Sequence, residues 1–323
     1  PIILMENIQI GNNKITISPN GKWLFALSDS LHTGFLWDLR GDNTNLAPKV
    51  LRGHEGLIRT VSFSFDERFL ATGDSLNQVR LWDLNTLITE PRVLQGHKEH
   101  MYDIAVSNDG ELLATAGIDG DAYLWSLHDQ RLEPTIFSHD RMVSKVYFSP
   151  NKKWLATISG DGETSVQFWD LENPERKPTI VDRFDLDIWN LAFNPSGEQF
   201  ATGSYDGSII LWNTDPLKKL AVFKQHSKFI QVLEFSSNGK YLVAGSYDSS
   251  GSLWDLSESN ETPDLFTEQI GSNFAIAISP DMNWLATEGH NNKIRIYDFN
   301  DLVDSPCLVI ETEGAIENIV FSS

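Results

Sequence analysis

The chain of 323 residues has a single cysteine, Cys307, so no disulfide can form within it. A reactive thiol needs a nearby base or cation that lowers its pKa, and no such group is identifiable around the apolar run Cys307-Leu308-Val309-Ile310. We therefore expect Cys307 to be a small buried strand residue. Because disulfides are rare in the cytosol, a chain without them is predicted to be cytoplasmic.

Long apolar runs are also missing. A helix that spans a bilayer needs roughly 20 consecutive apolar residues, and no stretch of this sequence approaches that length. The opening run Pro1-Ile2-Ile3-Leu4-Met5 is too short for a signal peptide and lacks a basic leader. No membrane contact is therefore predicted. Because the first residue is proline rather than methionine, we expect the chain to be part of a longer polypeptide.

Basic residues are scarce. The chain has 25 Lys and Arg against 45 Asp and Glu, which gives a formal net charge of −20. Such a surface repels phosphate backbones, so nucleic acid is not an expected partner. Acidity of this kind either keeps a protein in solution or recruits a basic partner, and the first reading is favoured.

What the sequence does contain is one short pattern repeated seven times: a hydrophobic residue, then an aromatic residue, and usually an acid. Successive central aromatics lie 45, 43, 44, 43, 42 and 43 residues apart. A constant period of this size means one supersecondary unit copied many times. The seven copies are Leu36-Trp37-Asp38-Leu39, Leu81-Trp82-Asp83-Leu84, Leu124-Trp125-Ser126-Leu127, Phe168-Trp169-Asp170-Leu171, Leu211-Trp212-Asn213, Leu253-Trp254-Asp255-Leu256 and Ile296-Tyr297-Asp298-Phe299.

Residues 91–127 show the unit clearly, because four short extended runs are separated by turn residues. The runs are 91–94, 101–106, 112–116 and 122–125, and no stretch has a competing helical period. Pro, Asn, Asp and Gly mark the turn between the second and third of these runs in nearly every copy. Four antiparallel strands per unit make a propeller blade. The sequence predicts an all-β, seven-bladed β-propeller with first strands near residues 14, 58, 101, 144, 188, 230 and 274.

With these motifs in place, the chain resembles the WD-repeat β-propeller family over essentially its whole length. The Gly-His turns Gly53-His54 and Gly96-His97, together with the Trp-Asp endings, carry the resemblance. Its regular copies also resemble bacterial WD-repeat arrays fused to signalling or nucleotide-binding switch proteins. That likeness implies further domains in the same polypeptide as partners.

The resemblance implies a hydrogen-bonded tetrad in each blade, made of a turn His, a second-strand Ser or Thr, a turn Asp and the Trp. Blade 3 has all four residues: His97, Thr115, Asp119 and Trp125. The other blades have partial sets. Blade 2 has Leu76 at the Asp position, blade 4 has Asp161 in a longer turn, blade 5 has Phe184 in place of His, and blade 6 has Ala244 on the second strand.

A His, an Asp and a hydroxyl at fixed spacing resemble a catalytic triad, but the set recurs around the ring beside a Trp, as a structural device does. The acidic turns Asp119-Gly120-Asp121 and Asp161-Gly162-Glu163 lack the remaining ligands of a calcium loop. We therefore expect no catalytic residue, no metal and no cofactor.

In the family that the chain resembles, partners bind the face around the central channel, on loops that open the first strand and precede the turn Asp. Aromatic residues at these positions have the composition of an interface core. Alternatively, they only cap the inner strands at the channel mouth. The candidate partner-binding residues are Leu57, Arg59, His100, Tyr102, Met142, Asp187, Trp189, Tyr205, Phe229, Tyr247 and Phe274.

Two classes of function are open. The first is a non-catalytic scaffold or sensor domain that binds a protein or peptide on this face. The second is a propeller hydrolase with its site in the channel mouth, which would need acids or a nucleophile converging from several inner strands. The channel-facing positions are mostly small, with Glu234 as the only acid. An interaction module is therefore preferred.

The ends predict how the ring closes. We expect the whole chain, 1–323, to form one propeller within a longer polypeptide, and residues 315–323 resemble the start of an eighth repeat. Both Pro1–Met5 and Cys307–Ile310 read as outer strands. Since an exposed sheet edge is a liability, we expect Cys307–Ile310 to complete the seventh blade through its short connection.

Overall fold

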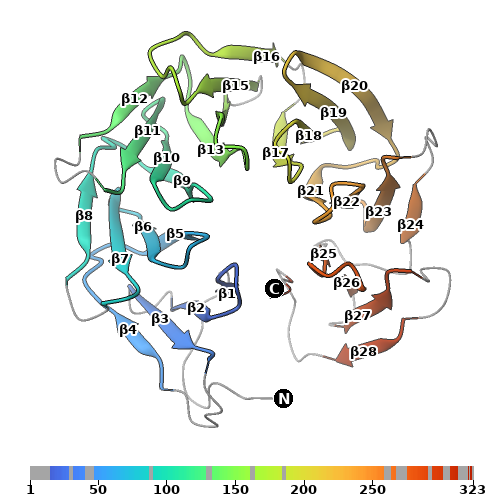
Figure 1. Cartoon of the computed structure of the whole chain (residues 1–323), viewed down its shortest axis with the longest axis horizontal. Helices are drawn as coiled ribbons and strands as arrows, with labels where there is room; N and C mark the ends of the chain where they lie inside the picture. Colours follow the sequence, from blue (N-terminus) through green and yellow to red (C-terminus); the bar gives the residue numbers. More distant parts are fainter. Residues whose placement is uncertain are drawn as a thin grey trace.

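The computed structural model describes residues 15–28, 32–40, 47–86, 90–128, 133–160, 164–183, 187–257, 263–266, 275–289, 293–300, 306–311, 319 and 321. All the regular secondary structure in these described residues consists of β-strands. The 28 strands form seven separate four-stranded antiparallel sheets. Figure 1 shows the sheets arranged radially around one axis, each with its first strand nearest the centre. The predicted seven-bladed propeller is confirmed.

The strands of each blade follow one another outward from the centre, and each pairs with the next. The innermost strands are β1 (Ile15–Ile17), β5 (Ile58–Phe63), β9 (Met101–Val106), β13 (Val143–Phe148), β17 (Ile188–Phe193), β21 (Ile230–Phe235) and β25 (Ile276–Ile278). The second strands are β2 (Trp23–Ser28), β6 (Phe69–Asp74), β10 (Leu112–Gly117), β14 (Trp154–Ser159), β18 (Gln199–Ser204), β22 (Tyr241–Ser246) and β26 (Trp284–Gly289).

The third strands contain the repeated aromatic motif and end close to it. They are β3 (Thr33–Asp38), β7 (Gln78–Asp83), β11 (Asp121–Ser126), β15 (Ser165–Asp170), β19 (Ser208–Thr214), β23 (Ser250–Asp255) and β27 (Lys293–Asp298). The outer strands are β4 (Lys49–Leu51), β8 (Arg92–Gln95), β12 (Thr135–Ser138), β16 (Thr179–Arg183), β20 (Leu217–Lys224), β24 (Asp264–Phe266) and β28 (Leu308–Glu311).

The sequence repeat and the blade are out of step by one strand. The run near residue 91, with which the repeat 91–127 opens, is β8, and it pairs with β7 of blade 2 rather than with blade 3. Each sequence repeat therefore contributes its first strand to one blade and the other three to the next. This offset ties neighbouring blades together through the chain itself.

The seventh blade is closed by β28, which pairs with β27 from Ile296↔Leu308 to Lys293↔Glu311. The expected outer strand of this blade is thus confirmed. Cys307, however, is exposed, as is all of β28. The prediction of a buried thiol is wrong because the run forms the edge of its sheet and nothing in the described chain covers it. Residues 1–5 and the stretch 315–323, apart from two single positions, lie outside the described residues.

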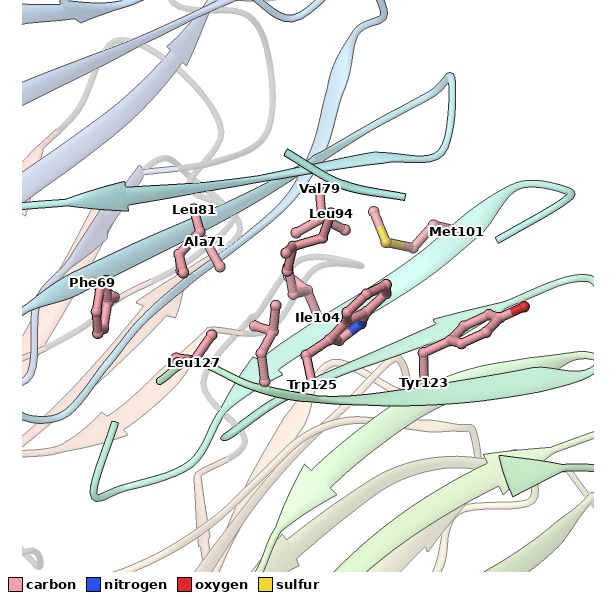
Figure 2. Close-up of a cluster of buried hydrophobic side chains, with 11 residues drawn as sticks. Phe69, Ala71, Val79, Leu81, Leu94, Met101, Ile104, Tyr123, Trp125 and Leu127 are labelled. Atoms are coloured by element: carbon pink, nitrogen blue, oxygen red, sulfur yellow. The ribbon is translucent and has the colours of Figure 1, made fainter. Parts of the chain in front are cut away.

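The hydrophobic core of the described residues is divided into seven clusters, six of which combine side chains from two adjacent blades. The cluster between blades 2 and 3 is drawn in Figure 2, where Phe69, Ala71, Val79 and Leu81 face residues of β9 and β11. Leu94 from β8 is only 1% exposed, and Trp125 from the next blade packs in the same cluster. Since burial of apolar area is the main stabilising term in folding, each blade is stabilised mainly by its neighbours.

The turns after the innermost strands share one hydrogen bond that composition alone does not reveal. In each blade, the side-chain oxygen of the residue that follows the strand accepts the backbone N–H of the residue five positions later. The accepting residues are Ser18, Ser64, Ser107, Ser149, Asn194, Ser236 and Ser279. A short hydroxyl or amide that binds nearby backbone holds a turn of this kind.

Candidate functional site

The polar corner of blade 2 is a buried network of four side chains. His54 Nδ1 lies 2.7 Å from Asp74 Oδ2, and His54 Nε2 lies 2.7 Å from Thr72 Oγ1. The indole N–H of Trp82 donates to the same Thr72 oxygen at 2.9 Å. The acid of this corner is therefore Asp74 at the end of β6. The repeat spacing predicted the acid position at Leu76, in the turn, but Asp74 reaches the histidine from the strand.

Blade 3 contains two of the three expected contacts. His97 Nδ1 lies 3.0 Å from Asp119, and His97 Nε2 lies 2.8 Å from Thr115 Oγ1. The indole nitrogen of Trp125 is buried but has no hydrogen-bond partner among the described residues. Tyr123 pairs with Thr115 across the ladder and places its ring edge-on against His97 at 4.4 Å. The indole packs against that tyrosine, so the expected link from Trp125 to Thr115 or His97 is not made.

Blade 6 replaces the missing second-strand hydroxyl with one from the third strand. Ala244 pairs directly with Ser252, and the Ser252 hydroxyl lies 2.9 Å from His226 Nε2. Trp254 donates to Ser252 at 3.0 Å. The hydroxyl has changed strands without leaving the corner, because cross-strand neighbours are within reach of the same partner.

Blades 4 and 5 keep the hydroxyl–indole contact. Trp169 donates to Thr157, which also contacts His139 Nε2 at 2.8 Å, and Trp212 donates to Thr202 at 3.1 Å. Asp161 and Phe184, named from the sequence for these two corners, lie outside the described residues.

The corner hydroxyls cannot serve as nucleophiles, since a nucleophile must reach a substrate. Thr72, Thr115, Thr157, Thr202 and Ser252 are each 0% exposed. Buried polar groups of this kind need partners, and the corners supply them. The structure therefore gives these residues a stabilising position within the blades.

The corner histidines predict how stability depends on pH. Burial lowers the pKa of His139 from 6.5 to about 4, and burial also lowers the pKa values of His97 and His226 despite the neighbouring Asp119 and Asp248. A lowered folded-state pKa means that the unfolded chain binds the proton more readily. The stabilisation is therefore complete above pH 6.5 and is lost as the pH falls from there toward 4.

We expect the free energy of unfolding to fall between pH 6.5 and 4, with His139 alone contributing about 3 kcal/mol to the loss. Urea titrations across this range check the slope. His139→Gln removes one titrating ring and should give a shallower slope than the parent chain. Equal slopes would contradict the assignment.

The second candidate region is the mouth of the central channel, where five blades contain the same β-bulge. On each innermost strand the register skips one residue against its partner. The skipped residues are Arg59, Tyr102, Ser144, Trp189 and Gln231. Bulges redirect side chains away from the regular alternation of a strand. Arg59, Tyr102 and Trp189 are exposed as a result.

A recurring backbone hydrogen bond places two further positions beside each bulge. The residue just before the innermost strand accepts the N–H of a residue in the turn between the second and third strands. The donor–acceptor pairs, 2.8 to 3.0 Å apart, are Ser75–Leu57, Ile118–His100, Gly160–Met142, Tyr205–Asp187 and Tyr247–Phe229. All the described candidate residues thus lie at one end of blades 2 to 6. Phe274 lies outside the described residues.

Four of these residues form a contiguous aromatic cluster across the junction of blades 5 and 6: Trp189, Tyr205, Phe229 and Tyr247. Phe229 stacks with Tyr205 at 5.2 Å and with Tyr247 at 4.9 Å between ring centroids, and it also contacts Trp189 at 5.9 Å. Phe229 is partly buried, whereas Trp189, Tyr205 and Tyr247 are 49%, 55% and 38% exposed. Of the other described candidates, Asp187 precedes β17 in blade 5, whereas Leu57, Arg59, His100, Tyr102 and Met142 belong to blades 2 to 4.

The walls of the channel carry polar contacts between blades. Asp103 on β9 accepts the backbone N–H of Val146 at 3.2 Å, so Glu234 is not the only acid on an inner strand. Tyr147 donates to Asn190 at 3.2 Å. Burial raises the pKa of Glu234 to about 7. These contacts join blades 3, 4 and 5.

Sequence reasoning found the rim positions but missed Ser144 and Lys228. The Lys228 ammonium lies 5.6 Å from the centroid of the Tyr247 ring. No group of three or more His, Cys, Asp or Glu side chains within the described ranges could hold a metal ion. None of the described segments forms a helix that is long and apolar enough to cross a membrane.

Comparison with known proteins agrees with this architecture. The family model described as WD domain, G-beta repeat matches residues 47–83, 88–126, 131–170, 181–213, 217–255 and 272–298, which is more than half of the chain. The chain is 38% identical over 221 residues to WD repeat and SOCS box-containing protein 1 of Danio rerio, covering 65% of this chain and 50% of that protein.

A second relative is transcription initiation factor TFIID subunit 5 of Caenorhabditis elegans. It is 32% identical over 85 residues, which are 26% of this chain and 12% of that protein. The chain thus spans half or less of the length of these relatives. Six matched repeats and seven blades lead to one conclusion: the chain belongs to the WD-repeat family of β-propellers.

Proposed function

We propose that this propeller is a non-catalytic interaction scaffold or sensor domain that binds a protein or peptide at the channel mouth. The observation that carries the proposal is the aromatic cluster of Trp189, Tyr205, Phe229 and Tyr247, three of whose rings are more than a third exposed. Contiguous exposed apolar surface on a folded domain marks interaction sites. Trp and Tyr are the residues that contribute most to binding at such sites.

The arrangement also supports binding over mere capping of the channel. Phe229 is the partly buried ring at the centre of the cluster, and it touches the other three. The three outer rings come from a bulge and from two turns, which hold them without burying them. Rigid aromatic side chains lose little entropy on binding, so they suit an anchor.

The names of the relatives support the same class of function. One is named as a subunit of a transcription initiation factor and the other as a protein that contains a SOCS box. A subunit is by definition part of an assembly. We carry over to this chain only the general role of a protein-binding module.

The proposal is tested by selecting peptides from a randomised display library on the purified propeller and measuring their affinity for variants. Trp189→Ala should weaken the selected peptides about thirtyfold, which corresponds to about 2 kcal/mol for an anchor residue. Trp284→Ala is the matched control, because Trp284 is also an exposed tryptophan, at 40%, but starts β26 of blade 7 and is not one of the candidate residues of the mouth.

Both variants should retain the thermal midpoint of the parent, since both side chains are exposed. If the peptides bind Trp189→Ala and the parent equally well, the cluster is not the binding surface. A loss that is equal for Trp284→Ala and Trp189→Ala would show that the effect is not specific to the mouth.

A further inference from the structure

The three stacked rings of the cluster form a ladder with nearly parallel planes. The ring of Phe229 is inclined by 22° to that of Tyr205 and by 20° to that of Tyr247. Near the Tyr247 end the chain supplies its own cation, Lys228, over the ring. At the Tyr205 end the ring is 55% exposed, and Trp189 stands at 72° to it with centroids 6.5 Å apart. This second end forms an open corner between two aromatic rings.

The loop that leads into the same corner contains an acidic residue. Asp187 is two residues ahead of Trp189, and its carbonyl oxygen accepts the N–H of Tyr205 at 2.8 Å. One oxygen of the Asp187 carboxylate is buried and has no hydrogen-bond partner within the described part of the chain. An unpaired buried acceptor is costly, so turning this carboxylate outward to meet a donor of a ligand would be stabilising.

Flat aromatic faces beside a carboxylate favour a planar cation. The guanidinium of arginine stacks on aromatic rings and offers N–H groups in a fork that matches a carboxylate, whereas the lysine ammonium is a compact, strongly hydrated charge. The formal net charge of −20 attracts a basic segment from a distance.

We propose that the corner formed by Asp187, Trp189 and Tyr205 binds an arginine side chain of the partner. The guanidinium stacks on Tyr205, extending the ladder, and donates to the Asp187 carboxylate. This inference rests on the proposed function, because it names the side chain that the mouth recognises.

The test uses synthetic peptide pools that share one fixed central residue and have randomised flanks, measured by fluorescence polarisation on the purified propeller. The fixed residue is arginine, lysine, or citrulline, which has nearly the shape of arginine without its charge. We expect the arginine pool to bind about tenfold more tightly than the citrulline pool, with the lysine pool between them.

Two variants test whether the preference for arginine depends on the Asp187 carboxylate. Asp187→Asn should remove most of the difference between arginine and citrulline. Asp140→Asn removes the same negative charge from an exposed position in the corresponding loop of blade 4. This variant should leave the difference between arginine and citrulline unchanged.

The outcomes separate this inference from the proposed function. Binding that is lost in Trp189→Ala but shows no preference for arginine overturns the arginine corner alone. Binding that Trp189→Ala leaves intact overturns both, as does failure of every pool to bind. A preference for arginine that survives Asp187→Asn but disappears in Asp140→Asn would place the cation site in blade 4.

Discussion

Asp74→Ala should be among the most destabilising single substitutions in this protein, lowering the free energy of unfolding by about 3–5 kcal/mol. The side chains of His54 and Asp74 are both 0% exposed and lie 2.7 Å apart. The carboxylate also accepts the backbone N–H groups of Leu76 and Gln78. Removing it leaves three donors, on His54, Leu76 and Gln78, without this acceptor.

Asp74 stabilises the folded chain in its ionised form. Burial raises the pKa of Asp74, but the hydrogen bonds from His54 and from the Gln78 and Leu76 amides outweigh burial, and the pKa ends below its ordinary value. Its stabilisation is therefore present above the ordinary carboxyl pKa and is lost as the pH falls below it.

Asp119→Ala in blade 3 is the matched control. Asp119 also contacts a corner histidine and a backbone N–H, from Lys98, but its side chain is 6% exposed. We expect about 1–3 kcal/mol for this variant. Chemical denaturation of both variants at neutral pH measures the difference. A loss from Asp119→Ala equal to or larger than that from Asp74→Ala would contradict the link to burial.

Gly207→Ala should cost about 2–5 kcal/mol, because it combines an unfavourable backbone conformation with a clash. Gly207 has φ of +85°, and a Cβ there would lie 2.4 Å from the carbonyl oxygen of His226 and 2.8 Å from that of Lys228. His226 is held in its corner by Ser252, so the loop has little freedom to retreat. We also expect weaker peptide binding, since Tyr205 and Phe229 flank this contact.

Gly120→Ala provides a close control at the equivalent position of blade 3. Gly120 has φ of +82°, and its added Cβ would meet the corresponding carbonyl oxygens of His139 and Arg141 at 3.2 and 3.5 Å. The backbone strain is the same and the clash is milder, so we expect a loss of about 1–2 kcal/mol. Thermal or urea unfolding compares the two, and equal losses would show that φ alone determines the cost.

The two glycines show where sequence reasoning stops. Both turns read Asp-Gly, and the sequence predicts a tight turn for each. What makes one substitution tolerable and the other severe is the distance from the added Cβ to the carbonyl oxygens of a loop in the next blade. That distance depends on how the two blades pack, and the local sequence does not determine it.

The polar corners show the same limit. The positions of His97, Thr115 and Asp119 could be predicted because the same spacing repeats along the chain. Asp74 and Ser252 could not be predicted, since Asp74 reaches its histidine from the end of the second strand and Ser252 from the third strand. Likewise, the bonding of Trp125 depends on Tyr123, which lies across the ladder from Thr115.

The sequence by itself determined the number of blades, the approximate strand positions and the rim residues, because all three follow from a period of about 43 residues and from local turn chemistry. The tertiary structure alone decided which rim residues touch. Trp189 and Phe229 are 40 positions apart in the chain, yet their rings meet because the ring of blades brings a bulge of β17 against the loop before β21. It also decided that Cys307 is exposed, since burial depends on what covers an edge strand and not on how apolar that strand is.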